Sequence, residues 1–119
     1  MEYNTLQVGK IGEDIAVDYL CKKEYSILAR NWRHKHYEID IIACKNNRLH
    51  IIEVKTRNSL DFGYPEESIG KAKMQFLKNA ASSYQYQHPQ WKYLQFDVIA
   101  IRLEKNTIQE VFFIEDVYF

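Results

Sequence analysis

The sequence predicts an α/β domain in which helices flank a mixed β-sheet, with elements in the order α-β-β-β-α-β-β. Two observations carry this prediction. Two long segments place apolar residues at helical spacing, and five shorter segments alternate apolar and polar residues or run apolar. The length of 119 residues fits one domain, so residues 1–119 are expected to form a single domain with a hydrophobic core.

The first helix is expected to begin after Asn4 and to run to about Lys23. Asn4 followed three residues later by Gln7 has the pattern of a capping box, in which each residue satisfies a free backbone N–H at the helix start. The small and apolar residues that recur at one-turn spacing are Ile11, Ile15 and Tyr19, and beside them Gly12, Ala16 and Leu20.

The remaining elements follow from the same kind of pattern. A second helix is expected from Glu66 to about Gln87, closed by His88 and Pro89. Its apolar side would be Ile69, Ala72, Phe76, Ala80 and Tyr84. Strands are predicted over residues 25–33, 37–44, 49–57 and 93–103, and residues 107–119 are expected to form a last strand with a short tail. A loop is expected over residues 58–65.

Composition limits the classes of function. The formal net charge is zero, whereas nucleic-acid-binding proteins usually carry an excess of basic residues. The charge is unevenly distributed, however, because residues 30–36 and 70–78 are locally basic and residues 104–119 are acidic. No apolar stretch approaches the ~20 residues of a membrane helix, and the first residues lack the apolar run of a signal peptide. Cys21 and Cys44 are expected to be small buried or half-buried thiols in a reducing cytoplasm.

The two strands around residues 45–48 bring acidic residues together. Asparagine tolerates the positive φ of a two-residue hairpin turn, so Asn46 and Asn47 are expected to form one. Counting back from that turn puts Asp40 opposite Glu53 and Glu38 opposite Lys55, and alternation along a strand puts these four side chains on one face.

Two carboxylates in this position need an explanation. Opposed residues on a sheet have Cβ atoms about 5 Å apart, and like charges at that distance repel by roughly 3 kcal/mol at an effective dielectric of 20. A divalent cation would turn Asp40 and Glu53 into ligands, and Lys55 could then stabilise developing negative charge. The alternative is a solvent-facing ladder of salt bridges in which Glu38 pairs with Lys55.

The first helix adds another acid. Gly9, Gly12, Glu13 and Ala16 share one side, and two interior glycines indicate close approach of the backbone, either to the sheet or to a phosphate. Glu13 would then point toward the acidic cluster, or else lie at the rim of the contact between helix and sheet.

Together, the segments "GKIGEDIAVDYL", "ILARNWR", "EIDIIA", "IIEVKTR" and "FGYPEESI" resemble the uncharacterised YraN-like family. That family is similar to the PD-(D/E)xK endonucleases and Holliday-junction resolvases. The resemblance implies a restriction-endonuclease-like fold and metal-dependent hydrolysis of DNA, with Glu13, Asp40 and Glu53 as metal ligands and Lys55 as the catalytic lysine. Two departures, Tyr37 where the family has glycine and Gln95 where it often has arginine, affect the substrate-contacting surface.

Other polar and aromatic residues allow two interpretations each. Predicted phosphate contacts are Arg30, Arg33, Lys35, Arg57, Lys71 and Lys78. Lys71 and Lys78 are seven residues apart on one side of the second helix, which could instead be its wet side, and Lys73 is expected to point elsewhere. Surface or packing roles are favoured over ligand or base-stacking roles for His34, His36, His50, His88, Trp32 and Trp91. Asp97 is either part of the site or a satisfied structural acid.

We therefore predict a Mg²⁺- or Mn²⁺-dependent DNA endonuclease, acting on branched or damaged DNA if it follows the resolvases. A non-catalytic nucleic-acid-binding module of the same fold is the first alternative. A structural or adaptor domain with a salt-bridge ladder is the second. A homodimer is expected for a nuclease that cuts both strands, because one site cuts only one.

Overall fold

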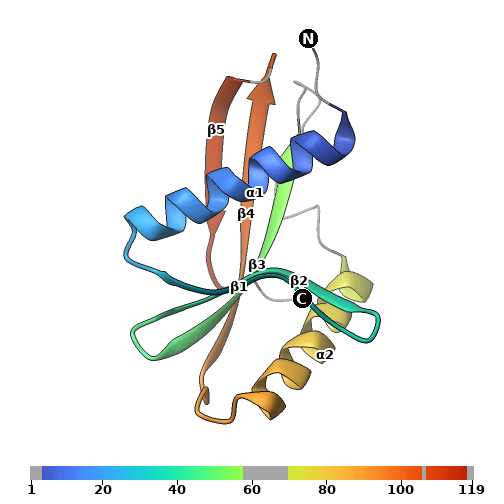
Figure 1. The fold of residues 1–119 in the computed structure, drawn as a ribbon, viewed down its shortest axis with the longest axis vertical. Helices are drawn as coiled ribbons and strands as arrows, with labels where there is room; N and C mark the ends of the chain where they lie inside the picture. Colours follow the sequence, from blue (N-terminus) through green and yellow to red (C-terminus); the bar gives the residue numbers. More distant parts are fainter. Residues whose placement is uncertain (1–3, 58–69, 106, 118–119) are drawn as a thin grey trace.

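A computed structural model describes residues 4–57, 70–105 and 107–117 of the chain. Within these ranges the elements follow the predicted order (Figure 1). They are α1 (Thr5–Lys22), β1 (Ser26–His34), β2 (Tyr37–Lys45), β3 (Arg48–Arg57), α2 (Lys71–Gln87), β4 (Leu94–Glu104) and β5 (Thr107–Ile114). The predicted loop over residues 58–65 lies outside the described residues.

The five strands form one mixed sheet in the order β1-β2-β3-β4-β5. All neighbours are antiparallel except β3 and β4, which are parallel and are separated in sequence by α2. The predicted mixed sheet flanked by helices is confirmed. In Figure 1, β1 and β2 run across the view while β3, β4 and β5 run along its height, so the sheet is strongly twisted.

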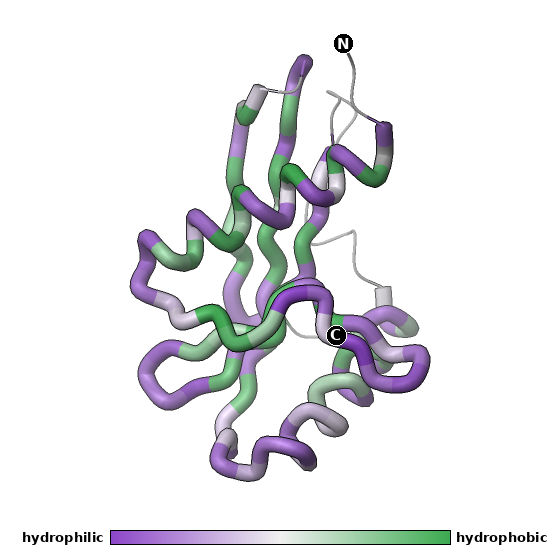
Figure 2. Tube along the Cα trace, viewed as in Figure 1, coloured by the Kyte–Doolittle hydropathy of each residue, from purple (hydrophilic) through white to green (hydrophobic). Residues whose placement is uncertain are grey.

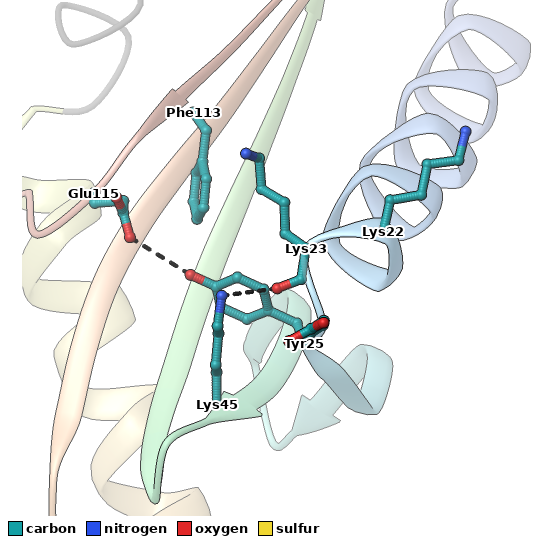
Figure 3. A pocket seen from close by; sticks show the side chains of 7 residues that line it. Lys22, Lys23, Tyr25, Lys45, Phe113 and Glu115 are labelled. Carbon is teal, nitrogen blue, oxygen red and sulfur yellow. Dashed lines mark hydrogen bonds between the residues drawn. The ribbon is translucent and has the colours of Figure 1, made fainter.

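Helix α1 begins and ends as its residues predict. The Asn4 side chain accepts from the Gln7 N–H at 2.8 Å, and the Gln7 side chain accepts from the Asn4 N–H at 2.9 Å, which completes the capping box. At the other end, Lys45 Nζ donates to the Lys23 carbonyl at 2.7 Å (Figure 3). Cys21 is exposed, contrary to the prediction of a buried or half-buried thiol, because it lies on the outer side of this last turn.

Helix α2 differs from the predicted helix in its start and in its buried side. It begins at Lys71 with Gly70 as its N-cap, and the predicted start at residues 66–69 lies outside the described residues. Ala72 is exposed and Phe76 is half-buried. The buried side is rotated from the predicted one and consists of Met74, Leu77, Ala80, Ala81 and Tyr84. The broader apolar stripe of the helix therefore decides which side packs on the sheet.

The two helices cover opposite faces of the sheet. Ala16 and Leu20 of α1 belong to one buried cluster with Ile52, whereas Ala81 of α2 belongs to another with Ile51. Successive strand residues point to opposite faces, so this alternation separates the two cores. Figure 2 shows hydrophobic residues along the middle strands and hydrophilic residues at the hairpin tips. Each face of the sheet thus packs against one helix, with a layer of buried side chains between the sheet and that helix. None of the described helices is long and apolar enough to cross a membrane.

Candidate active site

The site lies where β2 and β3 separate. Asn46 and Asn47 have φ of 53° and 62°, which confirms the predicted turn, and the pairing runs from Lys45 opposite Arg48 to Ile41 opposite Ile52. Beyond Ile41, the side chain of Asp40 takes the place of a backbone acceptor, since its Oδ2 accepts from the Val54 N–H at 2.9 Å. Asp40 therefore sits at the fork between the two strands, next to Glu53.

The environment of Asp40 disfavours its charge. Burial, together with the nearby negative charges of Glu53 and Glu38, raises the pKa of Asp40 to about 7, against the lowering effects of the Val54 N–H and of Lys73. The predicted proximity of Asp40 and Glu53 is thus present, and so is the electrostatic strain expected of it.

Glu53 is buried and holds two ammonium groups. Lys55 Nζ lies 3.6 Å from Glu53 Oε1, and Lys73 Nζ lies 3.4 Å from the same oxygen. Lys73 points away from the side of α2 that Lys71 and Lys78 share, as predicted, but its contact with Glu53 was not predicted. Lys73 is one turn before the buried Leu77 and shares its side of α2, a spacing that was visible in the sequence.

Lys55 also lines a cleft of about 290 Å³ between α1 and β3, with Asp40 and Glu13. The other lining residues are Val8, Gly9, Val54, Thr56 and Arg57. The cleft thus joins Asp40 and Lys55 to a basic side chain, Arg57, which is exposed and donates to the Thr56 carbonyl at 3.1 Å.

The two glycines of α1 have different roles beside this cleft. A Cβ on Gly12 would lie 1.8 Å from Thr56 Oγ1, so only glycine lets α1 approach β3 this closely. A Cβ on Gly9 would meet nothing within 4 Å, which leaves the cleft open at that point. The close approach predicted from the glycines is therefore an approach to the sheet at Gly12.

Glu13 reaches the cleft but is bound to β1. It accepts from Asn31 Nδ2 at 2.7 Å and lies 3.5 Å from the Arg30 guanidinium. Over the described ranges, no group of three or more His, Cys, Asp or Glu side chains stands close enough to hold a metal ion. The structure thus brings Asp40 and Glu53 together and leaves Glu13 at the rim of the helix–sheet contact.

The salt-bridge ladder is not formed. Glu38 lies 3.4 Å from the Arg33 guanidinium on β1, and the predicted pairing of Glu38 with Lys55 is absent from the register of β2 with β3. The prediction was wrong because it assumed a regular hairpin, whereas the two strands separate after Ile41. Lys55 turns to Glu53 on its own strand instead.

The predicted phosphate contacts are spread over three regions. Arg30 is held by Asp14 at 2.6 Å, which also lowers the pKa of that carboxyl. Arg33 and Lys35 are exposed near the tip of the β1–β2 hairpin, and Lys35 has φ of 57° in its turn. On α2, Lys71 is exposed and Lys78 is half-buried. Among these residues, only Arg57 also lines the cleft.

A second polar cluster lies near the other end of α1. His50 Nδ1 lies 2.7 Å from Asp97 Oδ2, and both side chains are buried. Asp97 Oδ1 accepts from Gln95 Nε2 at 2.8 Å and from the Asp116 N–H at 2.9 Å. Asp97 is therefore a fully satisfied structural acid, and Gln95, one of the departures from the YraN-like pattern, is one of its donors.

Tyr25 covers this buried pair and faces a second cleft. Its ring meets His50 edge-on at 4.9 Å, and its hydroxyl lies 3.5 Å from Glu115 (Figure 3). Burial and the charge of Glu115 raise the pKa of Tyr25 to about 12. The cleft, of about 340 Å³, is also lined by Lys22, Lys23, Glu24, Lys45 and Phe113.

The tryptophans, and the histidines outside the Asp97 cluster, make aromatic packing contacts. Trp32 meets Tyr84 edge-on at 5.4 Å and stacks with His34 at 5.9 Å. Further aromatic pairs bring His36 against Tyr37 and Phe76, and His88 against Tyr84. Trp32 and Trp91 both border the core on the α2 face. These contacts agree with the packing roles favoured from the sequence.

Comparison with known proteins identifies relatives along nearly the whole chain. Residues 12–101 match the model of the uncharacterised protein family UPF0102, which confirms the resemblance to the YraN-like family. A UPF0102 protein of Flavobacterium psychrophilum is 44% identical over 118 residues, covering 99% of this chain and 97% of that protein. A UPF0102 protein of Caldicellulosiruptor bescii is 42% identical over 118 residues, covering 97% and 99%. One of Dictyoglomus thermophilum is 41% identical over 104 residues, covering 87% and 88%.

Proposed function

Because the chain belongs to the uncharacterised protein family UPF0102, whose name assigns no activity, we propose a function from the site itself. The protein is a Mg²⁺- or Mn²⁺-dependent endonuclease that hydrolyses phosphodiester bonds in DNA, on a restriction-endonuclease-like fold. The observation that carries the proposal is the pair of facing carboxylates, Asp40 and Glu53, at the fork of β2 and β3 with Lys55 beside them. Like charges directly opposite each other destabilise a sheet.

The donor atoms fit a hard divalent cation. Carboxylate oxygens are the ligands that Mg²⁺ prefers, and the ion commonly takes one or two carboxylates while water and substrate phosphate complete its shell. Asp40 and Glu53 supply that number, so the position of Glu13 does not weigh against the fit. When bound, the ion would lower the pKa of a bound water and neutralise phosphoryl oxygens.

The other side chains of the cleft complete the chemistry. Lys55 carries a positive charge that can stabilise the negative charge growing on the phosphoryl group, without acting as a ligand while it is protonated. Arg57, at the rim, can hold a neighbouring phosphate. Arg33 and Lys35 on the β1–β2 hairpin would extend this contact along the DNA backbone.

A cleavage assay tests the proposal. Linear, nicked and branched DNAs are incubated with the wild-type chain and with Glu53→Gln, in Mg²⁺, Mn²⁺ or chelator. We expect the wild type to cut at least one substrate with metal and Glu53→Gln to cut none. Asp18→Asn is the matched control, because Asp18 is an exposed acid of α1 paired with Lys22 and should cut like the wild type. A folded wild type that cuts no DNA with either metal would contradict the proposal.

A further inference from the structure

Lys73 gives the acidic pair a cation that comes from another element. Its Nζ lies 3.4 Å from Glu53 Oε1, nearer than Lys55 Nζ at 3.6 Å, and the Glu53 side chain is 7% exposed. A buried carboxylate is stable only with a partner, so the metal-free protein needs at least one of these ammonium groups. Both approach the same carboxylate oxygen, which leaves little room for a third cation.

The two lysines differ in how easily their ammonium groups can move away from Glu53. Lys55 is on β3, two residues from Glu53, and its side chain is 23% exposed in the cleft. Lys73 is on α2 and is 39% exposed, and its Nζ also lies 5.8 Å from the ring centre of Phe76. Its long, partly exposed side chain can therefore swing toward solvent.

We propose that Lys73 is a built-in counter-ion that occupies Glu53 in the metal-free protein and is displaced when a divalent cation binds there. This inference rests on the proposed metal site. A divalent ion at Glu53 repels both ammonium groups, and the one with a path to solvent moves. The released ammonium group remains on the α2 side of the site, where it can meet the incoming phosphate.

The first experiment measures binding of Mn²⁺ by calorimetry in the absence of DNA. Lys73→Met keeps the length of the side chain and removes its charge, so it should bind Mn²⁺ about tenfold more tightly than the wild type. Lys92→Met is the matched control, since Lys92 is exposed outside α2 and its loss changes the net charge equally. It should bind like the wild type.

The second measurement uses the wild type alone, so it does not depend on how a variant folds. Acetylation of lysines followed by mass spectrometry should label Lys73 faster with saturating Ca²⁺ than in chelator, whereas labelling of Lys92 should not change. In chelator, Lys73→Met should also melt lower than the wild type because Glu53 then keeps Lys55 as its remaining cationic partner and loses the nearer one. Adding Glu53→Gln to that variant should restore the melting temperature.

The outcomes separate the two proposals. Tighter Mn²⁺ binding by Lys73→Met together with metal-dependent labelling of Lys73 supports the counter-ion role. If the wild type binds Mn²⁺ but Lys73→Met binds it equally or more weakly, or if labelling of Lys73 ignores Ca²⁺, the counter-ion role is wrong and the metal site stands. If neither the wild type nor Lys73→Met binds Mn²⁺, both proposals are wrong.

Discussion

Two buried acids of the same sheet, Asp97 and Asp40, have opposite surroundings. Asp97 meets three donors, from His50, Gln95 and the Asp116 backbone. Asp40 accepts one backbone N–H and lies near the carboxylates of Glu53 and Glu38, and burial together with these charges raises its pKa to about 7 in spite of Lys73. Burial alone therefore does not distinguish the acid proposed to bind a metal ion from a structural acid. The difference lies in whether the neighbours of the carboxylate are donors or further negative charges.

The two clefts also differ in how their charged side chains are paired. The larger one, of about 340 Å³, contains three lysines, but Lys45 is bound to the Lys23 carbonyl and Lys22 lies 2.9 Å from Asp18. The smaller one, of about 290 Å³, contains Asp40 and Lys55 beside the open position at Gly9. The size of a cleft is thus a poorer indicator of a functional site than whether its charged groups already pair with other groups of the protein.

The largest effect is expected at the structural acid. Asp97→Ala should lower the free energy of unfolding by about 3–5 kcal/mol, because it leaves His50, Gln95 and the Asp116 N–H without their shared acceptor. Urea denaturation followed by circular dichroism measures this. A decrease in the free energy of unfolding below about 1 kcal/mol would contradict the difference described between Asp97 and Asp40.

Lys55→Ala should have the next largest effect, on rate rather than on stability. Removing one group that stabilises transition-state charge typically lowers the rate by about 100- to 1000-fold. Metal binding should stay largely intact, because the protonated lysine is no ligand. Cleavage assays beside Mn²⁺ titrations measure both quantities. Cleavage at the wild-type rate would remove Lys55 from the mechanism.

Asp40→Asn should make the metal-free protein more stable. It keeps the shape of the side chain and removes a charge that Glu53 repels, so a relief of ~1 kcal/mol would raise the melting temperature by a few degrees. The variant should also lose part of the further rise that Mg²⁺ or Mn²⁺ gives the wild type. A lower melting temperature in chelator, with a wild type indifferent to both ions, would contradict the metal site.

The same variant has a predictable pH dependence. The folded protein holds the Asp40 proton up to about pH 7, whereas the unfolded chain releases it near its ordinary value of 3.8. The contribution of this group to stability is therefore complete below the unfolded pKa and is lost as the pH rises toward 7. The stability gained by Asp40→Asn should grow between pH 4 and pH 7 and then level off. Melting curves across this range measure it, and a constant difference would contradict the raised pKa.

The smallest effect is expected from single basic residues on the surface. Lys35→Ala should weaken DNA binding a few-fold and reduce the dependence of log Kd on log salt by about one unit, as for one lost phosphate contact. Arg30→Ala should change binding less, because Asp14 already holds that guanidinium. Fluorescence anisotropy with Ca²⁺ present measures both. An equal or larger loss for Arg30→Ala would show that Asp14 does not compete with DNA.

Most of the features that the sequence predicted correctly depend on residues that are close together in the chain. The Asn4 and Gln7 caps, the Asn46–Asn47 turn and the strand bounds depend on local hydrogen bonds and φ preferences, and the structure agrees with them. The proximity of Asp40 and Glu53 also followed, because a short hairpin turn sets the register of its strands.

Contacts between distant elements depended on the tertiary structure. The fork of β2 and β3 breaks the regular register, so Glu38 pairs with Arg33 and not with Lys55. Three pairs join residues 18 to 47 positions apart, namely Asn31 with Glu13, Lys73 with Glu53, and His50 with Asp97. Turn and cap residues act on their immediate neighbours, whereas these pairs depend on the twist of the sheet and on how the helices rotate against it. The sequence thus determined the acidic pair, and the packing of α1 and α2 decided which other charges meet it.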